Sequence, residues 1–250
     1  MTNDTPSTPV DIYSYEALLF DLDGVITPTA KLHRQAWARM FSAFLDSRGA
    51  RPYTEQDYFD FLDGRRRDEG IQALLDSRGI SLPLGSDSDA ATEDTVHGLG
   101  TRKNEDFLAL VAEGVDAYEG SVQLLDAIRD RGADGEHVPH IAIVSSSKNA
   151  RQVLEAAGLL DRFEVIVDGV VASEEKLPGK PAPDTYEYGA KKLGVPVDKA
   201  VVLEDATSGV ASGRAGHFGL VIGVDRGAGK QALLDHGADV VVQDLAELLG

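Results

Sequence analysis

The chain of 250 residues is long enough for one large domain or a core with a smaller partner, and its 42% hydrophobic and 26% charged residues are typical of globular proteins. It contains no cysteine and no apolar run of the roughly 18 to 20 residues that cross a membrane, which excludes disulfides, thiolate chemistry and an integral membrane protein. The formal net charge of −18 disfavours nucleic acid and membranes as partners, so an anionic substrate needs local cations or a metal ion.

The N-terminal region, residues 1–14, is polar and contains prolines, so we expect a flexible tail. It shows no export signal, which favours a cytoplasmic location. The apolar run 17–20 then ends at Asp21 and is soon followed by Gly24. This pattern predicts a buried strand that leads into a loop.

An inserted segment, residues 31–118, has a different texture. Apolar residues recur at helical spacing in three stretches of it, 32–49, 65–79 and 101–114. Gly49 and Gly79 are placed to end the first two helices. The stretch 80–100 is rich in Ser, Asp and Gly and predicts an elaborated loop.

Strand and helix patterns alternate from residue 120 to the C-terminus. The predicted strands are 139–144, 163–169, 200–206, 219–225 and 238–245. The predicted helices are 121–132, 149–160, 182–194 and 208–216. This alternation predicts right-handed βαβ units around a parallel sheet. We therefore expect a doubly wound, Rossmann-like α/β core domain (15–30 and 119–250) with an α-helical cap domain (31–118) inserted after the first strand.

Charged and hydroxyl side chains come just past several of the predicted strands, where open parallel sheets bind their ligands. In chain order these residues are Asp21, Asp23, Ser145, Lys180, Glu204 and Asp205. Four carboxylates gathered at one edge repel one another unless they share a cation, which favours Mg²⁺ bound by oxygen ligands. Lys180 and Ser145 would then hold the oxygens of a phosphoryl group.

Each of these residues also has a structural explanation when it is taken alone. Asp21-Leu22-Asp23 could form a turn, Ser145 could be the N-cap of the next helix, and Lys180 could be a solvated loop charge. Their occurrence in order at the strand ends of one predicted sheet favours the functional interpretation.

Four segments of the chain resemble the four motifs of the haloacid dehalogenase superfamily. They are DLDGVIT (21–27), VSSSKN (144–149), GKPAPD (179–184) and VLEDATSGVASGRAG (202–216). The resemblance covers nearly all of residues 15–245 and is to the β-phosphoglucomutase-like branch of phosphatases and phosphomutases. Three further segments resemble the substrate-reading segments of that branch: LHRQAW (32–37), DGRRRDEG (63–70) and TRKN (101–104).

The resemblance implies an enzyme that transfers a phosphoryl group through an aspartyl-phosphate. Asp21 would be the nucleophile, and Asp23 would be the general acid and base. Mg²⁺ would be held by the carboxylate of Asp21, the backbone carbonyl of Asp23 and Asp205, with Glu204 in or next to this set of ligands. The lysine and the serine named above would stabilise the charge on the phosphoryl oxygens.

The resemblance also implies a sugar phosphate as the substrate, and most directly the conversion of β-glucose 1-phosphate to glucose 6-phosphate through the 1,6-bisphosphate. The substrate-binding residues that it implies are His33, Trp37, Gly64, Arg67, Lys103, Ser146, Ser147, Lys148 and Asn149. Arg67 and the run 147–149 would hold the second phosphate. His33 and Lys103 would couple substrate arrival to the position of the acid/base carboxylate.

Two features of chain geometry follow from the same resemblance. We expect a cis peptide bond between Lys180 and Pro181, and a cap that closes about hinges at 25–29 and 118–120. The inserted segment is longer than the mutase pattern, with extra residues near 51–58 and across 82–99. These insertions leave open a sugar other than glucose, or a disaccharide phosphate.

Other activities remain open from the sequence. A sugar-phosphate phosphatase shares every core motif and differs in that water accepts the phosphoryl group. A phosphonatase would need Lys31 or Lys103 to form a Schiff base, whereas a dehalogenase has no use for Asp23. A phosphosugar-binding protein without turnover is disfavoured because the acidic motif residues, Ser145 and Lys180 are all present. We expect a monomer.

Overall fold

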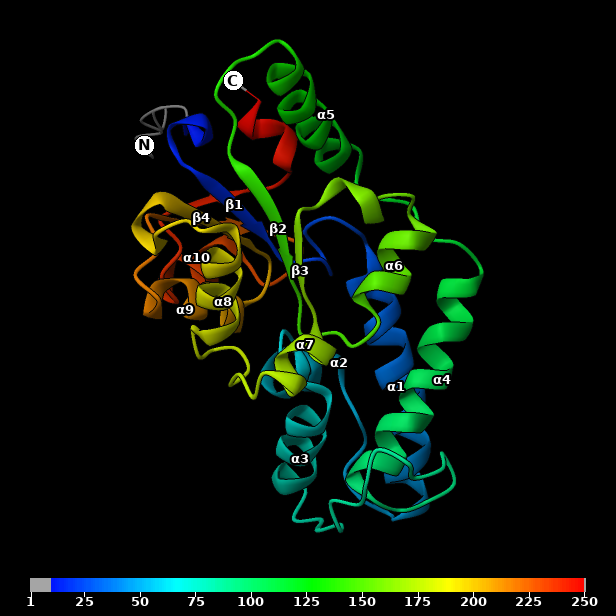
Figure 1. Ribbon diagram of the computed structural model, residues 1–250. Helices are drawn as coiled ribbons and strands as arrows, with labels where there is room; N and C mark the ends of the chain where they lie inside the picture. The colour runs from blue at the N-terminus through cyan, green and yellow to red at the C-terminus, as the bar shows by residue number, and fades with distance from the viewer. Residues whose placement is uncertain (1–9, 250) are drawn as a thin grey trace, which may run out of the picture.

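The computed structural model describes residues 10–249 and contains a six-stranded sheet in the order β3-β2-β1-β4-β5-β6 (Figure 1). The strands are β1 (Ala17–Phe20), β2 (His140–Val144), β3 (Val165–Val167), β4 (Ala200–Glu204), β5 (Leu220–Val224) and β6 (Val240–Val242). Every neighbouring pair is parallel, and each strand lies within an apolar run that predicted it. The predicted α/β fold is confirmed.

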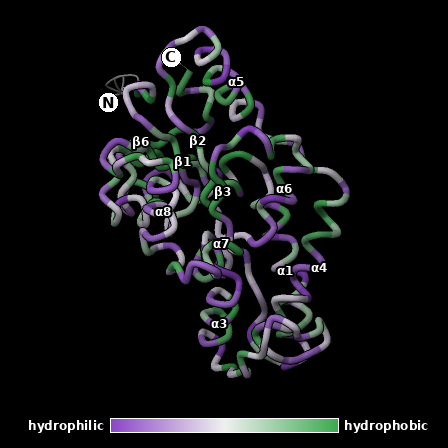
Figure 2. Tube along the Cα trace, viewed as in Figure 1, coloured by the Kyte–Doolittle hydropathy of each residue, from purple (hydrophilic) through white to green (hydrophobic). Residues whose placement is uncertain are grey.

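Both faces of the sheet are covered by helices, which is why its strands are apolar along their length. In β1, Leu18 and Phe20 pack in one hydrophobic cluster, and Ala17 and Leu19 pack in another. This alternation follows from the period of two of an extended strand. In Figure 2 the strands in the middle of the sheet carry hydrophobic residues, whereas hydrophilic segments recur along the outer helices.

The helices that cover the sheet follow β1 and the inserted segment in the chain. One face is covered by α5 (Glu119–Ala133), α6 (Ala150–Ala156) and the 3-10 helix η5 (Leu245–Leu248). The other face is covered by α8 (Asp184–Leu193), α9 (Thr207–Ala215) and α10 (Lys230–Asp235). The short helices η3 (Leu160–Arg162), α7 (Gly169–Glu174) and η4 (Val197–Lys199) lie in the connections.

The inserted segment has a hydrophobic cluster of its own, which includes Trp37, Phe41 and Leu74. Its helices are α1 (Thr29–Ser47), α2 (Glu55–Asp57), the π-helix η2 (Tyr58–Leu62), α3 (Arg67–Ser77) and α4 (Val96–Ala112). They lie beyond one end of the sheet, with α1 beside α4 (Figure 1). The division into a core domain and a cap domain at the predicted boundaries stays a prediction.

The start of α4 differs from the sequence expectation. This helix begins at Val96, inside the stretch predicted as a loop, and the side chain of Thr95 caps it by accepting from the backbone N–H of Gly98. Gly98 and Gly100 lower the intrinsic helix propensity of this turn and conceal it in the sequence. The first is required by packing, since a Cβ there would lie 2.3 Å from the carbonyl oxygen of Glu93.

Two further expectations are corrected. Residues 12–14, predicted as part of a flexible tail, form the 3-10 helix η1 with Ile12 buried in the core; residues 1–9 lie outside the described part. Ser145 is not the N-cap of the following helix, because α6 begins only at Ala150 and Asn149 is its N-cap.

The predicted helix ends at Gly49 and Gly79 are confirmed. Both residues have left-handed backbone angles, with φ of 59° and 67°, which glycine adopts without steric cost. Among the helices described for residues 10–249, none is both long and apolar enough to cross a membrane.

Candidate active site

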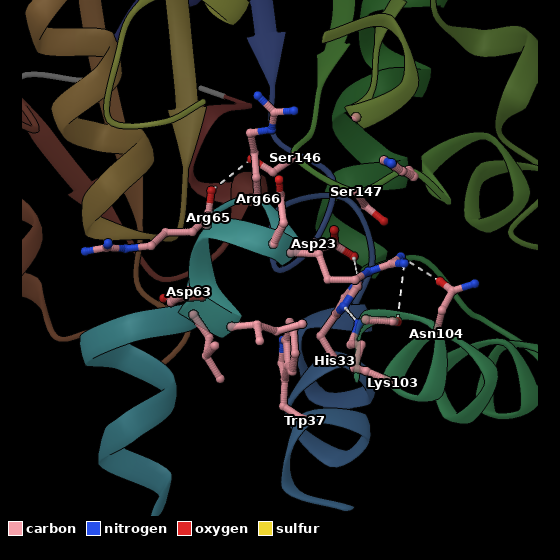
Figure 3. Close-up of a pocket in the computed structure, with 18 of the residues that line it drawn as sticks. Asp23, His33, Trp37, Asp63, Arg65, Arg66, Lys103, Asn104, Ser146 and Ser147 are labelled. Atoms are coloured by element: carbon pink, nitrogen blue, oxygen red, sulfur yellow. Dashed lines mark hydrogen bonds and ion pairs between the residues drawn. The ribbon is translucent and has the colours of Figure 1, made fainter. Parts of the chain in front are cut away.

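A cavity of about 510 Å³ lies between the carboxyl ends of the strands and the inserted segment. Asp21, Asp23 and Asp205 line it from the loops after β1 and β4. Side chains of α1 and α4 line the opposite wall, among them His33 and Lys103, and Figure 3 shows these two close to Asp23.

Three buried carboxylates gather at the sheet edge. Asp21, Glu204 and Asp205 each offer an oxygen, and these oxygens lie within 4.8 Å of one another. The parallel register explains their meeting, because Phe20 pairs with Leu203 and the next residues in both strands follow side by side. The predicted clustering of these residues is therefore present in the fold.

Lys180 inserts its ammonium group between two of these carboxylates. Its Nζ donates to Asp21 Oδ1 and to Glu204 Oε1, both at 2.6 Å, and to the carbonyl oxygen of Val144 at 3.1 Å. Burial by itself lowers the pKa of this ammonium group, but Asp21 and Glu204 more than offset burial and hold its pKa above the ordinary value. The Lys180–Pro181 bond is cis, as predicted.

The carboxylates of Glu204 and Asp205 are in different situations. Glu204 is extensively hydrogen-bonded, since besides the lysine it accepts from the hydroxyl of Tyr186 at 3.1 Å and from the backbone N–H of Ala206 at 2.9 Å. Asp205 lies against Gly24, whose φ is 94° and where a Cβ would lie 1.8 Å from the Asp205 carboxylate. Glycine at this position lets the carboxylate approach the loop after β1.

The charge of this cluster is unbalanced without a further cation. Burial, together with the neighbouring carboxylates, raises the pKa of Asp21 and that of Asp205 well above their ordinary values, and Lys180 only partly opposes this for Asp21. A hard divalent cation prefers such oxygen ligands and would keep them ionised. The donor set therefore fits a metal ion.

A second group of side chains surrounds Asp23. The hydroxyl of Thr29 donates to Asp23 Oδ1, and Nε2 of His33 lies 3.4 Å from the same oxygen. Nδ1 of His33 contacts the ammonium group of Lys103. Burial raises the pKa of Asp23, but His33, Thr29 and Lys103 together outweigh burial, and the net pKa is below its usual value.

Aromatic rings enclose this chain of contacts. His33 stacks on Phe107 with ring centroids 4.0 Å apart, and Lys103 Nζ lies 5.0 Å from the ring centre of Trp37 and 4.5 Å from that of Phe107. Burial, followed by the positive charge of Arg67, lowers the pKa of Lys103 well below its usual range. Burial, followed by Lys103, likewise lowers the pKa of His33.

The end of the cavity away from the carboxylate cluster carries cationic and amide side chains. Arg67 donates to Asn104 Oδ1 at 2.6 Å, and Asn149 donates to the same oxygen at 2.7 Å. Lys148 Nζ lies 3.4 Å from Asp87 Oδ1, which also lies 3.1 Å from Nδ1 of His97. Each of these two groups of contacts joins a residue of the core, Asn149 or Lys148, to residues of the inserted segment.

Hydroxyl groups join the two sides of the cavity. Ser146 donates to the carbonyl oxygen of Gly64 at 2.9 Å, and Ser208 donates to the carbonyl oxygen of Asp63 at 3.1 Å. Gly64 has a φ of 67°, and a Cβ there would lie 2.2 Å from the Ser208 hydroxyl. The loop 62–66 is thus held against the carboxyl ends of the strands.

Residues 15–217 match the family of haloacid dehalogenase-like hydrolases. The chain belongs to this family. It is 47% identical to a β-phosphoglucomutase of Mycobacterium tuberculosis over 245 residues, which cover 93% of this chain and 91% of the relative. It is 30% identical to a β-phosphoglucomutase of Bacillus subtilis, with 93% and 91% coverage. A β-phosphoglucomutase structure from Clostridium difficile has a TM-score of 0.72 at 26% identity and covers 94% of this chain and 93% of its own. These similarities confirm the expected phosphomutase or phosphatase.

Most of the predicted site residues of this haloacid dehalogenase-like enzyme line the cavity. Its lining includes Asp21, Asp23, His33, Trp37, Gly64, Arg67, Lys103, Ser146, Ser147, Lys148 and Asp205. Ser145, Asn149, Lys180 and Glu204 lie behind this lining and are buried. Ser145 Oγ accepts from the backbone N–H of Ser147 at 3.1 Å.

Several cavity residues were not predicted from the sequence. Asn104 directly follows Lys103 in a segment that the resemblance singled out, so its position was the available signal. Asp87 and His97 lie in or next to a stretch without periodicity, which offered no signal. Asp63 faces the carboxylate cluster, and burial, partly opposed by a hydrogen bond from Tyr58, raises its pKa to about 6.

Proposed function

We propose that this enzyme is a phosphomutase that converts β-glucose 1-phosphate to glucose 6-phosphate through the 1,6-bisphosphate. The observation that carries the proposal is that one cavity brings together two sets of side chains, each of which contains a cation. The proximal set is Asp21 with Lys180, and the distal set is Arg67, Lys148 and Asn149. A sugar that carries two phosphates needs both sites, whereas hydrolysis of a monophosphate needs only the first.

The proximal site is suited to phosphoryl transfer. Asp21 would attack the phosphorus atom and form an aspartyl-phosphate. Asp21, the backbone carbonyl of Asp23 and Asp205, with Glu204 in or next to this set, would hold Mg²⁺, which would supply positive charge to the phosphoryl oxygens. Lys180, whose pKa is raised, stays charged at neutral pH and stabilises the same oxygens.

Asp23 would move the proton at the sugar oxygen. Its pKa lies below the usual value, so in the free enzyme it is ionised and can take a proton from a sugar hydroxyl. That hydroxyl oxygen bonds to phosphorus as the bond from phosphorus to Asp21 breaks, which yields the bisphosphate. In the second half, the other phosphate is transferred to Asp21 and Asp23 returns the proton to the departing oxygen.

Contacts between the inserted segment and the strand ends support a mutase over a phosphatase. An aspartyl-phosphate that waits for a sugar must be protected from water. The contacts of Ser146 and Ser208 with the loop 62–66 hold the inserted segment against the strand ends. We further propose that residues 31–118 act as a cap on a core of 15–30 and 119–250, with hinges at 25–29 and 118–120.

The test is an assay of β-glucose 1-phosphate with Mg²⁺ and a trace of the 1,6-bisphosphate, in which glucose 6-phosphate and free phosphate are both measured. We expect isomerisation to dominate. Release of phosphate as the main product would establish the alternative, a sugar-phosphate phosphatase. Binding of the sugar phosphate without either product would leave only a binding protein.

A further inference from the structure

Asn104 connects the inserted segment to the core at the distal end of the cavity. Its side-chain oxygen accepts from the guanidinium group of Arg67 at 2.6 Å and from Nδ2 of Asn149 at 2.7 Å; the dashed line to Asn104 in Figure 3 is the first of these contacts. Arg67 and Asn104 belong to the inserted segment, whereas Asn149 is the N-cap of α6 in the core. One amide oxygen therefore joins donors from both sides of the cavity.

The guanidinium group of Arg67 depends on neutral oxygens for its orientation. No carboxylate of residues 10–249 lies within ion-pair distance of it, and its other contact is the carbonyl oxygen of Gly100 at 3.4 Å. Gly100 and Asn104 are one helical turn apart, so both acceptors lie on the same face of α4. The guanidinium group has five N–H donors, so several remain for an anion.

We propose that Asn104 is a positioning residue for the distal phosphate, an inference that rests on the function proposed above. Its oxygen aims Arg67 at the distal site and ties this arrangement to Asn149, so that the site is complete only while the inserted segment lies on the core. The bridge uses one Asn149 N–H, which leaves the other free for the same phosphate.

The neutrality of the amide is part of this role. A carboxylate at position 104 could accept from the same two donors, but it would neutralise the charge of Arg67 and repel a phosphate. An amide oxygen orients the guanidinium group and leaves its charge available to the ligand. Asn104→Ala therefore removes the bridge, whereas Asn104→Asp keeps the bridge and changes only the charge.

The experiment measures the binding of glucose 1,6-bisphosphate and of inorganic phosphate by calorimetry, with Mg²⁺ and in the Asp21→Asn background that prevents turnover. We expect Asn104→Ala to weaken bisphosphate binding about tenfold, the effect of one lost hydrogen bond to a charged group. Asn104→Asp should weaken it at least as much, and neither substitution should alter binding of inorganic phosphate at the proximal site. Glu105→Ala, at an exposed position of the same helix, is the matched control.

Several outcomes would overturn the inference. Full affinity for the bisphosphate in Asn104→Ala would show that Arg67 needs no bridge, and full affinity in Asn104→Asp would show that neutrality is irrelevant. Equal weakening of both ligands would indicate a merely structural role, and unfolding curves would then show a matching loss of stability. If the Asp21→Asn protein with Asn at position 104 does not bind the bisphosphate, the proposed distal phosphate site does not exist. Failure of the proposed function is seen separately, as phosphate release by the wild-type enzyme.

Discussion

The side-chain nitrogen of Lys103 contacts Nδ1 of His33, and Nε2 of the same ring lies 3.4 Å from Asp23 Oδ1. When Lys103 is protonated it can only donate to Nδ1, and a neutral His33 ring then carries its proton on Nε2, the nitrogen that faces Asp23. Nε2 is buried and has no partner with hydrogen-bond geometry. Its distance of 3.4 Å from Asp23 Oδ1 would have to shorten for a hydrogen bond to form. In the proposed mechanism, a substrate that draws Lys103 towards a phosphate would change the tautomer of His33, and through it the proton affinity of Asp23.

Lys103→Met tests how much the buried lysine lowers the stability of the fold. The lysine is 1% exposed and, among residues 10–249, has no carboxylate within ion-pair distance, so a buried apolar side chain should stabilise the fold by about 1 kcal/mol or more. Turnover of the phosphosugar should fall about tenfold or more, because Asp23 loses the series of contacts through His33 to Lys103 that would assist proton transfer. Urea unfolding and steady-state kinetics measure the two effects.

The pH dependence gives a second readout for the same variant. The pKa of Lys103 is depressed in the folded protein, so between its folded and unfolded pKa values the unfolded chain binds more protons, and the wild type gains stability as the pH rises towards 10. Lys103→Met should not share this gain, whereas Lys191→Met at an exposed site should. A variant that is both less stable and fully active would contradict the assignment.

Asp21→Asn should abolish turnover, with a loss of at least about a thousandfold, because the amide cannot form the acyl phosphate. Lys180 keeps its contact with Glu204 at 2.6 Å, so the fold should persist. Mg²⁺ binding should weaken and stay measurable by calorimetry, and a chelator should abolish wild-type turnover. Asp46→Asn, at an exposed position of α1, is the control; near-normal activity of Asp21→Asn would reassign the nucleophile.

Arg67→Ala should separate the two phosphate sites. We expect kcat/KM for β-glucose 1-phosphate to fall about a hundredfold, since a guanidinium–phosphate contact is lost. Hydrolysis of a small aryl phosphate uses only the proximal site and should change less than about threefold. Equal losses with both substrates would argue against a distal phosphate site at Arg67.

Asp87→Asn concerns the loop that precedes α4. The carboxylate lies 3.4 Å from Lys148 Nζ and competes with a substrate phosphate for that ammonium group. The side chain is 75% exposed, so we expect only about a two- to fivefold decrease in KM for the phosphosugar, with kcat unchanged. An increase in KM would instead show that Asp87 holds the sugar. Asp94→Asn is the control, because Asp94 lies on the same loop and pairs with Arg48 instead of Lys148.

Asp63→Asn should change the pH dependence of stability in the metal-free protein. The pKa of Asp63 is raised to about 6, so the folded state binds more protons than the unfolded chain, and this contribution is lost as the pH rises through 6. The variant should match the wild type near pH 4 and exceed it at pH 7, by at most about 3 kcal/mol. Urea unfolding at both pH values measures this, and a constant difference would rule out the titration of Asp63.

The sequence by itself determined the sheet and the proximal site. The apolar runs of β1 and β4 end at Asp21 and Glu204, and a parallel sheet places the ends of adjacent strands at one edge. Local periodicity was sufficient to predict the strands and to place these residues at strand ends, because it depends on short stretches of chain; the contact of Asp21 with Lys180 spans 159 positions and depends on the fold.

The tertiary structure decided the distal end of the cavity. Lys103 meets His33 across 70 positions of the chain, and Asn104 meets Asn149 across 45, and no local pattern encodes either contact. The start of α4 was hidden for a related reason: Gly98 costs helix propensity and is tolerated because the chain at Glu93 passes too close for a side chain. Packing between distant segments overrides local preference at such points, and the partners of a substrate-binding side chain are set there.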